Sequence, residues 1–234
     1  KNITNFDFMM RTEIVFGKDT ELRVGELVKK YGGTKVMIVM DGGGFIKKNG
    51  LFDRVVKALG ESGISYVELE GVQPNPRRSL VEKGLEIVKA EGVDFILPIG
   101  GSTIDTGKAI ALGMEYDNYW DFFTGSVPER IAPIGAISTI AATGSETSGS
   151  AVILDDIGDH AKHGNMFKHI RTLFAIMNPE LTYTVPPYQT GAGTTDILAH
   201  SFDSYFTYTD SYLGDKFSEA TMITAVKYGP IALK

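Results

Sequence analysis

The chain has 234 residues, of which 43% are hydrophobic and 22% are charged, as in an ordinary globular protein with a substantial core. A formal net charge of −6 without a clustered Lys/Arg face argues against nucleic acid as the main partner, because a phosphate backbone needs a basic surface. The chain has no cysteine, which excludes disulfides, thiolate catalysis and cysteine-based metal sites. No run approaches the ~20 apolar residues of a membrane span and the N-terminus lacks a signal peptide, so a cytoplasmic location is expected.

Strands and helices are predicted to alternate through the first part of the chain. Asp19 is expected to cap the first helix and Gly32-Gly33 to end it, as glycine commonly does. Continuous apolar runs such as Lys35–Met40 are typical of strands that are covered on both faces. The predicted strands cover residues 12–16, 35–40, 65–69, 95–99 and 132–137, and the helices between them cover 20–31, 51–62, 79–91 and 103–116.

This alternation indicates βαβ units, and hence an α/β fold with a doubly wound, mostly parallel sheet. Two further strands are expected at 151–154 and 173–177. They flank a variable loop over 155–172, whose three histidines are expected to face solvent.

From Pro186 onward the pattern changes, because only helices are predicted, at 189–205 and 215–226. A change from alternating strands and helices to helices alone suggests a domain boundary. The sequence therefore predicts an α/β dinucleotide-binding domain over 1–185 and the N-terminal part of an all-helical domain over 186–234.

The apolar run Phe95–Ile99 stops at Gly100-Gly101-Ser102, and a helix is predicted to follow directly. Glycine lets the backbone approach a ligand closely, since it has no Cβ. The N-terminus of the following helix points unpaired N–H groups and the positive end of its dipole at the turn. This arrangement favours an anion site, most often for phosphate, although a tight strand-to-helix turn without a ligand explains the same residues.

Two other stretches have a similar character. Gly42-Gly43-Gly44 follows a predicted strand, and residues 138–149, which are rich in hydroxyl groups, follow another. Neither glycine turn matches the G-x-G-x-x-G pattern of dinucleotide-binding proteins. The hydroxyl-rich stretch is interpreted as a second cradle for phosphate or ribose, the alternative being an ordinary polar loop. The aromatic cluster Trp120–Phe123 is expected to be packing rather than the lining of a site.

Asp196 and His200 lie four residues apart on a predicted helix, so both project from one face. A carboxylate and an imidazole placed in this way can occupy two positions on one divalent ion, and a catalytic metal needs about three protein ligands. A hydrogen bond between the two side chains explains the spacing equally. The chain contains no later histidine.

Several motifs, in one order, give the chain a resemblance to the iron-containing (group III) alcohol dehydrogenase family, most closely to its butanol dehydrogenase branch. The family motifs are Gly100-Gly-Ser-x-x-Asp105-x-x-Lys108, Ala142-Thr-Gly-Ser-Glu146 and Asp196-x-x-x-His200. The features of the branch are Gly42-Gly-Gly44, Lys47-Lys-Asn-Gly50, Gln73-Pro-Asn-Pro76, Trp120-Asp-Phe-Phe-Thr-Gly125 and Asn178-Pro-Glu-Leu-Thr-Tyr183.

The resemblance implies a dehydroquinate-synthase-like fold and reversible hydride transfer between NADP(H) or NAD(H) and a primary alcohol or aldehyde. It also implies a divalent metal, Fe(II) or Zn(II), that acts on the substrate oxygen as a Lewis acid. The partner is then a small-molecule substrate, and a homodimer is compatible with this interpretation. A glycerol dehydrogenase or dehydroquinate synthase type of enzyme is the alternative within the superfamily.

The resemblance also implies roles for individual residues. Asp105 would lie near the nicotinamide and orient it or the substrate, and Asp196 and His200 would be the first two metal ligands. The implied cofactor-binding residues are Gly42, Gly43, Asn75, Gly100, Gly101, Ser102, Thr139, Thr143, Ser145, Lys162 and Leu181.

The choice of coenzyme is predicted from the residue at position 43. NAD enzymes commonly place an acid against the ribose 2′-hydroxyl, where it would repel a 2′-phosphate. In this family such an acid would align near Gly43, which repels nothing, so NADP(H) is favoured over NAD(H). Asp41, where the branch usually has an aromatic residue, weakens this prediction.

The main departure from the family lies at the C-terminus. The family has two further metal-binding histidines on later helices, beyond residue 234. The chain is therefore expected to be a piece of a longer enzyme, or else a cofactor-binding fragment without activity that holds metal weakly.

Overall fold

The computed structural model describes residues 9–208 and 211–233. The chain divides into two compact units, each described here by itself. The first, called the α/β unit, comprises residues 1–138 and 145–178, and the second, called the helical unit, comprises residues 139–144 and 179–234.

The strands of the α/β unit are β1 (Glu13–Phe16), β2 (Lys35–Asp41), β3 (Ser65–Val72), β4 (Phe95–Pro98), β5 (Ala136–Ile137), β6 (Ser150–Leu154), β7 (Lys162–Met166) and β8 (Phe174–Met177). Its α-helices are α1 (Val24–Lys30), α2 (Phe45–Lys48), α3 (Leu51–Glu61), α4 (Arg78–Glu91), α5 (Ser102–Gly113) and α6 (Asp121–Thr124).

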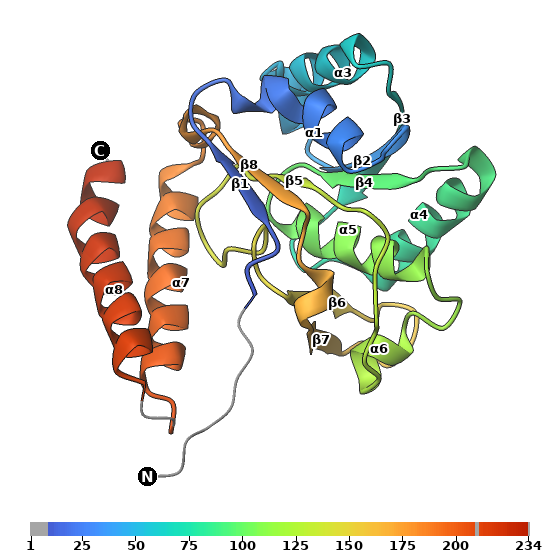
Figure 1. Ribbon diagram of the computed structural model, residues 1–234. Helices are drawn as coiled ribbons and strands as arrows, with labels where there is room; N and C mark the ends of the chain where they lie inside the picture. Colours follow the sequence, from blue (N-terminus) through green and yellow to red (C-terminus); the bar gives the residue numbers. More distant parts are fainter. Residues whose placement is uncertain (1–8, 209–210, 234) are drawn as a thin grey trace. The chain divides into compact units, whose positions relative to one another are not determined.

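The main sheet of the α/β unit is parallel, as predicted. Two three-stranded sheets, β3-β2-β4 and β1-β8-β5, are joined by parallel bridges from Ile96 to Ile134 and from Ile99 to Ile137. The strands therefore follow the order β3-β2-β4-β5-β8-β1. In Figure 1, α1 and α3 lie on one face of the sheet and α4 and α5 on the other, so the predicted doubly wound α/β fold is confirmed.

The core of the unit is formed by the strands that the apolar runs predicted. Every residue of β2 from Val36 to Met40 is at most 2% exposed. The helix α3 buries a single stripe that includes Leu51, Val55 and Leu59, and its other face is open to solvent, as its periodicity predicts. In contrast, α5 is buried along nearly its whole length. Gly107 makes this possible, because a Cβ there would lie 3.0 Å from the side chain of Pro98 on β4.

The start of the first predicted helix differs from the expectation. Residues Thr20–Arg23 form a 3-10 helix, and α1 begins only at Val24. Asp19 precedes this turn with φ of 57° and makes no capping hydrogen bond through its side chain, so the predicted cap is wrong. The predicted end is confirmed. The amide of Gly33 donates to the carbonyl of Val28 at 2.9 Å, in the Schellman pattern of a glycine-terminated helix.

The region between β5 and β8 also departs from the prediction. Residues 155–172 were expected to form a loop, but Lys162–Met166 is a strand, β7, that pairs antiparallel with β6. The predicted strand over 132–137 is reduced to Ala136–Ile137 and the isolated bridge at Ile134. The sequence of β7 contains no apolar run that could be detected, and its one buried residue is the polar Asn165.

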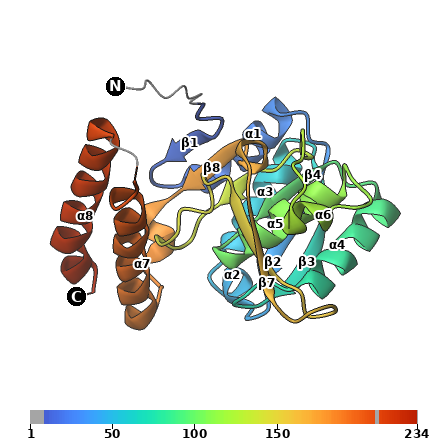
Figure 2. The same cartoon turned by 90° about the horizontal axis from the view of Figure 1, so that it is seen from below.

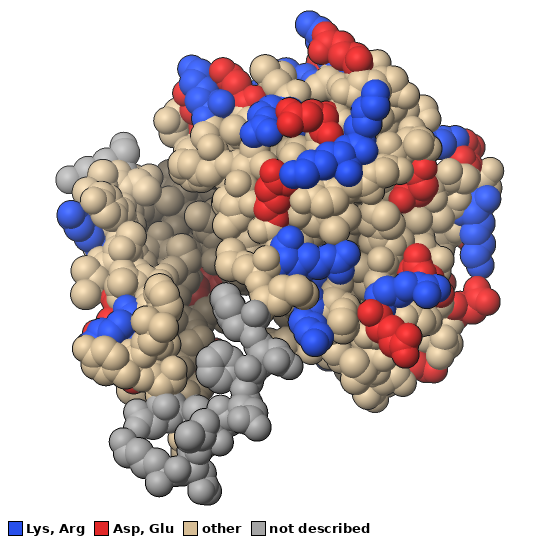
Figure 3. Space-filling model, viewed as in Figure 1, with Lys and Arg blue, Asp and Glu red and all other residues tan. Residues whose placement is uncertain are grey.

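The helical unit contains two long helices, α7 (Pro187–Tyr205) and α8 (Tyr212–Ala232). They lie side by side in both views of the ribbon (Figures 1 and 2). On the face seen in Figure 3, most of the visible surface of this unit is uncharged, and α8 exposes apolar side chains such as Phe217 and Ile223, 68% and 67% exposed. None of the helices in the described part of the chain is both long and apolar enough to cross a membrane.

Candidate functional site

The glycine turn lies between β4 and α5, at the carboxyl end of the parallel sheet. Gly100 has φ of 136°, a conformation that favours glycine, and its amide donates to the carbonyl of Ile137 at 3.0 Å. A Cβ at Gly100 would lie 2.9 Å from Oγ1 of Thr103. That hydroxyl is buried and has no hydrogen-bond partner among the described residues. A buried hydroxyl without a partner, in the first turn of a 12-residue helix, fits an anionic group bound at this turn.

Alanine at Gly100 is expected to weaken binding of the dinucleotide that the resemblance implies about tenfold, because relief of the strained φ, which costs about 1–3 kcal/mol, and of the contact between the new methyl group and Thr103 would change the shape of the turn. Titration of NADH fluorescence measures the affinity. Gly92→Ala is the matched control, since Gly92 has φ of 66° at the end of α4 with nothing within 4 Å of its Cβ position. Both variants should lose stability, whereas equal affinities for the two variants would contradict a role of this turn in binding.

Three more predicted residues follow neighbouring strands of the same sheet. Gly42 and Gly43 follow β2, and Asn75, which has φ of 61°, follows β3. Since β3, β2 and β4 are adjacent and parallel, their carboxyl ends share one edge of the sheet with Gly100.

Asp41, the last residue of β2, brings a carboxylate to this edge. Its Oδ2 atom lies 3.1 Å from the position that a Cβ on Gly43 would occupy. Its Oδ1 atom is buried and has no hydrogen-bond partner in the described part of the chain. A buried oxygen without a donor is suited to accept a hydrogen bond from a hydroxyl group of a ligand. From the sequence alone, Asp41 was recognised only as a departure from the residue usual in the branch.

Asp105 and Ser145 come together across 40 residues of sequence. The hydroxyl of Ser145 donates to Oδ1 of Asp105 at 2.6 Å, and the amide of Val152 donates to Oδ2 at 3.1 Å. Burial raises the pKa of Asp105, while the bond from Ser145 and the charge of Lys108 act against this rise. The side chain of Asp105 is thus oriented by two donors, and it holds Ser145 in turn.

The hairpin β6–β7 carries Lys162, which is exposed. The same hairpin region brings Asp155, Asp159 and His163 within 4.8 Å of one another, as the structure shows for the residues it describes. However, Asp155 already forms an ion pair with Arg78 at 3.3 Å. Asp159 and Nε2 of His163 are bonded to each other at 2.8 Å, so contacts within the protein account for the group without a ligand.

The histidines of this region are less exposed than predicted. His160 is exposed, but the side chain of His163 is 22% exposed and His169 is half-buried. His163 packs edge-on against Trp120, at 5.5 Å between ring centroids, and the indole also stacks on Phe123 at 5.0 Å. The aromatic cluster therefore packs within the α/β unit, and it extends over β7.

In the helical unit, the segment 139–144 lies against α7. A Cβ at Gly193 would be 2.4 Å from the carbonyl oxygen of Ala141, so only glycine admits this contact. The segment carries Thr139 and Thr143. Leu181 is buried in the 3-10 helix Pro179–Thr182.

Asp196 and His200 project from one face of α7, as predicted. Nε2 of His200 lies 3.7 Å from Oδ1 of Asp196, and the side chains are 57% and 38% exposed. Two ligands that each stand about 2.1 Å from one metal ion are about 3 Å apart, so a small rotamer adjustment would let both bind the same ion. Together, Asp196 and His200 would therefore supply two protein ligands to such an ion.

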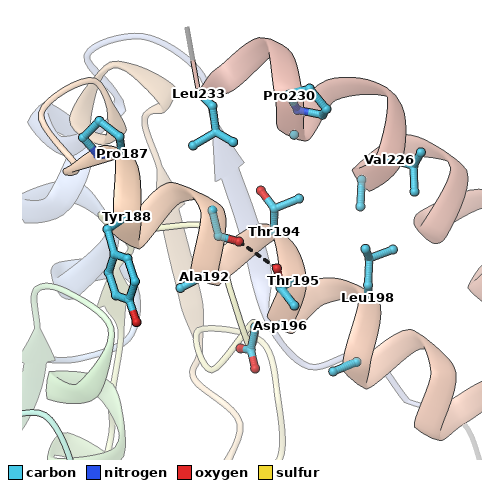
Figure 4. Close-up of a pocket in the computed structure, with 14 residues that line it drawn as sticks. Pro187, Tyr188, Ala192, Thr194, Thr195, Asp196, Leu198, Val226, Pro230 and Leu233 are labelled. Atoms are coloured by element: carbon cyan, nitrogen blue, oxygen red, sulfur yellow. Dashed lines mark hydrogen bonds between the residues drawn. The ribbon is translucent and has the colours of Figure 1, made fainter.

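An apolar groove of about 860 Å³ separates part of α7 from α8. In Figure 4, Leu198 of α7 and Val226 of α8 are among the residues that line it, and Thr195 donates to the carbonyl of Gly191 within α7. Asp196 lies at its edge.

The sequence of the chain is similar to those of known proteins. The family profile described as "Iron-containing alcohol dehydrogenase" matches residues 11–179. "NADH-dependent butanol dehydrogenase B" of Clostridium acetobutylicum is 46% identical over 236 residues, which cover 99% of this chain and 60% of the relative. "NADPH-dependent aldehyde reductase YqhD" of Escherichia coli is 34% identical over 240 residues, which cover 99% and 60%.

A solved structure is similar as well. The NADH-dependent butanol dehydrogenase A of Thermotoga maritima superposes with a TM-score of 0.91 at 38% identity, over 97% of this chain and 57% of that protein. The chain thus spans about 60% of the length of the curated relatives that it matches.

Proposed function

Because the chain belongs to the iron-containing alcohol dehydrogenase family, we propose that it forms part of an oxidoreductase that transfers a hydride between a nicotinamide dinucleotide and a primary alcohol or its aldehyde. The observation that carries the proposal is the turn before α5, where Gly100 and the unpartnered hydroxyl of Thr103 fit a bound anion. Residues 186–234 are proposed to begin the helical metal domain of this enzyme. A cytoplasmic location and assembly as a homodimer are proposed together with it.

The proposed dinucleotide site uses the carboxyl edge of the sheet. The turn Gly100–Ser102 would hold the pyrophosphate, and Asn75 would lie near the adenine. Ser145, fixed by its bond to Asp105, would bind the phosphates or the nicotinamide ribose. The further residues proposed to take part are Gly42, Gly43, Thr139, Thr143, Lys162 and Leu181.

In the proposed reaction, the bound metal and coenzyme would supply the chemistry, and the chain would position the reactants. A divalent ion, Fe(II) or Zn(II), held by Asp196 and His200 with other ligands, would polarise the substrate oxygen, and the nicotinamide would carry the hydride. Asp105 would orient the reacting partners through the hydroxyl that it holds, because positioning of the donor and acceptor carbons is the protein's main contribution to hydride transfer.

The preferred coenzyme is proposed to be NAD(H) rather than NADP(H). The prediction of NADP(H) rested on Gly43, which cannot repel a 2′-phosphate. Asp41, however, extends its carboxylate to within 3.1 Å of the Cβ position of Gly43, and its free oxygen would accept a ribose hydroxyl. The relative named an NADH-dependent butanol dehydrogenase supports this assignment.

Alanine in place of Asp41 is expected to shift the ratio of NADPH affinity to NADH affinity at least tenfold toward NADPH, about 1.4 kcal/mol, because the variant loses both the repulsion of the 2′-phosphate and the acceptor of the hydroxyl. Fluorescence titration with both coenzymes measures the ratio. Asp53→Ala, an exposed acid on α3, is the control. A wild-type preference for NADPH would identify NADP(H) as the coenzyme, and a ratio that Asp41→Ala leaves unchanged would show that Asp41 does not set the choice.

The activity is tested by following NADH oxidation with butanal and other aldehydes, after Fe(II) or Zn(II) is added to protein stripped with EDTA. Both the 234-residue chain and the product of the complete reading frame are assayed. Metal-dependent turnover by the latter supports the proposal. Dinucleotide binding without turnover on any aldehyde would contradict it.

A further inference from the structure

Lys108 is a charged residue in the middle of the buried helix α5, with no exposed surface. Its ammonium group donates to three backbone carbonyl oxygens of one segment, those of Ser145 at 2.7 Å, Ser148 at 3.0 Å and Ser150 at 2.7 Å. An ammonium group has three N–H donors and no acceptor, so these carbonyls match its full capacity. The hydroxyls of Ser145 and Ser148 lie further away, at 3.2 and 3.4 Å.

The segment 145–150 depends on donors from outside itself. It has no helix, and only its last residue belongs to a strand. Arg171 donates to the carbonyl of Thr147 and Thr172 to that of Glu146, while the amide of Phe167 donates to that of Gly149. Each carbonyl from 145 to 150 therefore has a donor, and Lys108 supplies half of these contacts. A buried carbonyl without a donor is costly, so loss of Lys108 would release the segment.

The charge state of Lys108 at neutral pH agrees with this geometry. Burial lowers its pKa to about 8, while the negative charges of Asp105 and Glu146 raise it and the positive charge of Arg171 lowers it. At pH 7 the group is therefore mainly an ammonium ion with three donors.

We propose that Lys108 is a positioning residue of the dinucleotide site, which holds segment 145–150 so that Ser145 stays bonded to Asp105 and peptide oxygens are turned away from an anionic ligand. The inference rests on the proposed function, because it assigns Ser145 to the binding of the coenzyme. Lys108 itself cannot contact the coenzyme, since its three donors are occupied within the protein. Its effect passes through the backbone of the segment and through Ser145.

The test compares Lys108→Met with Lys89→Met, a matched control on the neighbouring helix α4, where the lysine side chain is 74% exposed. Amide hydrogen exchange in residues 145–152 is expected to be at least tenfold faster in Lys108→Met, whereas exchange in β3 stays at the wild-type rate. The dissociation constant for the coenzyme is expected to rise at least tenfold, and Lys89→Met should change neither quantity.

Lys108→Arg covers the case in which the methionine variant does not fold. The planar guanidinium keeps the charge but cannot direct donors at three carbonyls around one point, so faster exchange and weaker binding are still expected. Wild-type exchange rates in residues 145–152 of a folded Lys108 variant, or unchanged coenzyme affinity, would overturn the inference. If the wild-type chain binds neither NADH nor NADPH, the proposed function fails, and hydrogen exchange alone still decides whether Lys108 holds the segment.

Discussion

Alanine in place of His200 is expected to lower metal-dependent oxidation of NADH by butanal about a thousand-fold. Nε2 of His200 lies 3.7 Å from the carboxylate of Asp196, and its removal leaves Asp196 as the remaining member of this pair of proposed metal ligands. Lewis-acid stabilisation of the developing negative charge is worth several kcal/mol, and about 4 kcal/mol corresponds to three orders of magnitude in rate. The rate is measured on the product of the complete reading frame at saturating Zn(II) or Fe(II).

The control for this prediction is His169→Ala, which removes a half-buried imidazole from the α/β unit. It should retain metal-dependent turnover. Because the dinucleotide site is assigned to other residues, His200→Ala should bind NADH with near-native affinity. A variant at His200 that keeps more than about a tenth of the activity, well short of the thousand-fold loss expected from the Lewis-acid term, would remove this residue from the metal site.

Alanine in place of Gly135 is expected to reduce the free energy of unfolding by about 3 kcal/mol, at the upper end of the usual cost of overpacking. The added Cβ would lie 2.2–2.5 Å from three ring carbons of Phe174. That ring is fully buried between Tyr31 and Phe95, with centroids 6.1 and 6.0 Å away, so it has no room to move. Urea denaturation followed by circular dichroism measures the change.

Gly60→Ala, in the same unit, is expected to have the opposite effect on the free energy of unfolding. Gly60 is exposed in α3, and nothing lies within 4 Å of its Cβ position. Alanine there should stabilise the chain by about 0.5–1 kcal/mol, because glycine costs more backbone entropy in a helix. Equal unfolding energies for the two variants would show that the packing around Phe174 is looser than the structure indicates.

The fold of the α/β unit follows from patterns that are local in sequence. The apolar run Lys35–Met40 gave a buried strand because both faces of a parallel sheet are covered by helices. Gly32-Gly33 ended α1 through a local hydrogen-bond pattern that glycine favours. In contrast, Asp19 was predicted to cap the helix, but it has a left-handed conformation before a 3-10 helix, and its side chain makes no capping hydrogen bond. The strand β7 has no apolar run, since it pairs antiparallel with β6 and most of its residues are exposed.

The candidate site was predictable where its residues share one turn or one helical face. Gly100, Gly101 and Ser102 are contiguous, and Asp196 and His200 are one helical turn apart. Lys108 was visible in the motif as the one lysine of α5, but its role was not. Its acceptors lie 37–42 residues further along the chain, and no periodicity connects them.

By itself, the sequence determined the alternation of strands and helices, the position of the glycine turn and the order of the motifs, because these depend on neighbours within a few residues. Only the tertiary structure decided that Asp41 reaches the position of Gly43 and that Lys108 binds three carbonyls of segment 145–150. The contacts of Lys108 arise because two segments 37–42 residues apart are packed into one core, whereas that of Asp41 depends on the conformation of the turn after β2. Their energy comes from satisfying buried polar groups, which depends on burial and geometry that a linear pattern does not contain.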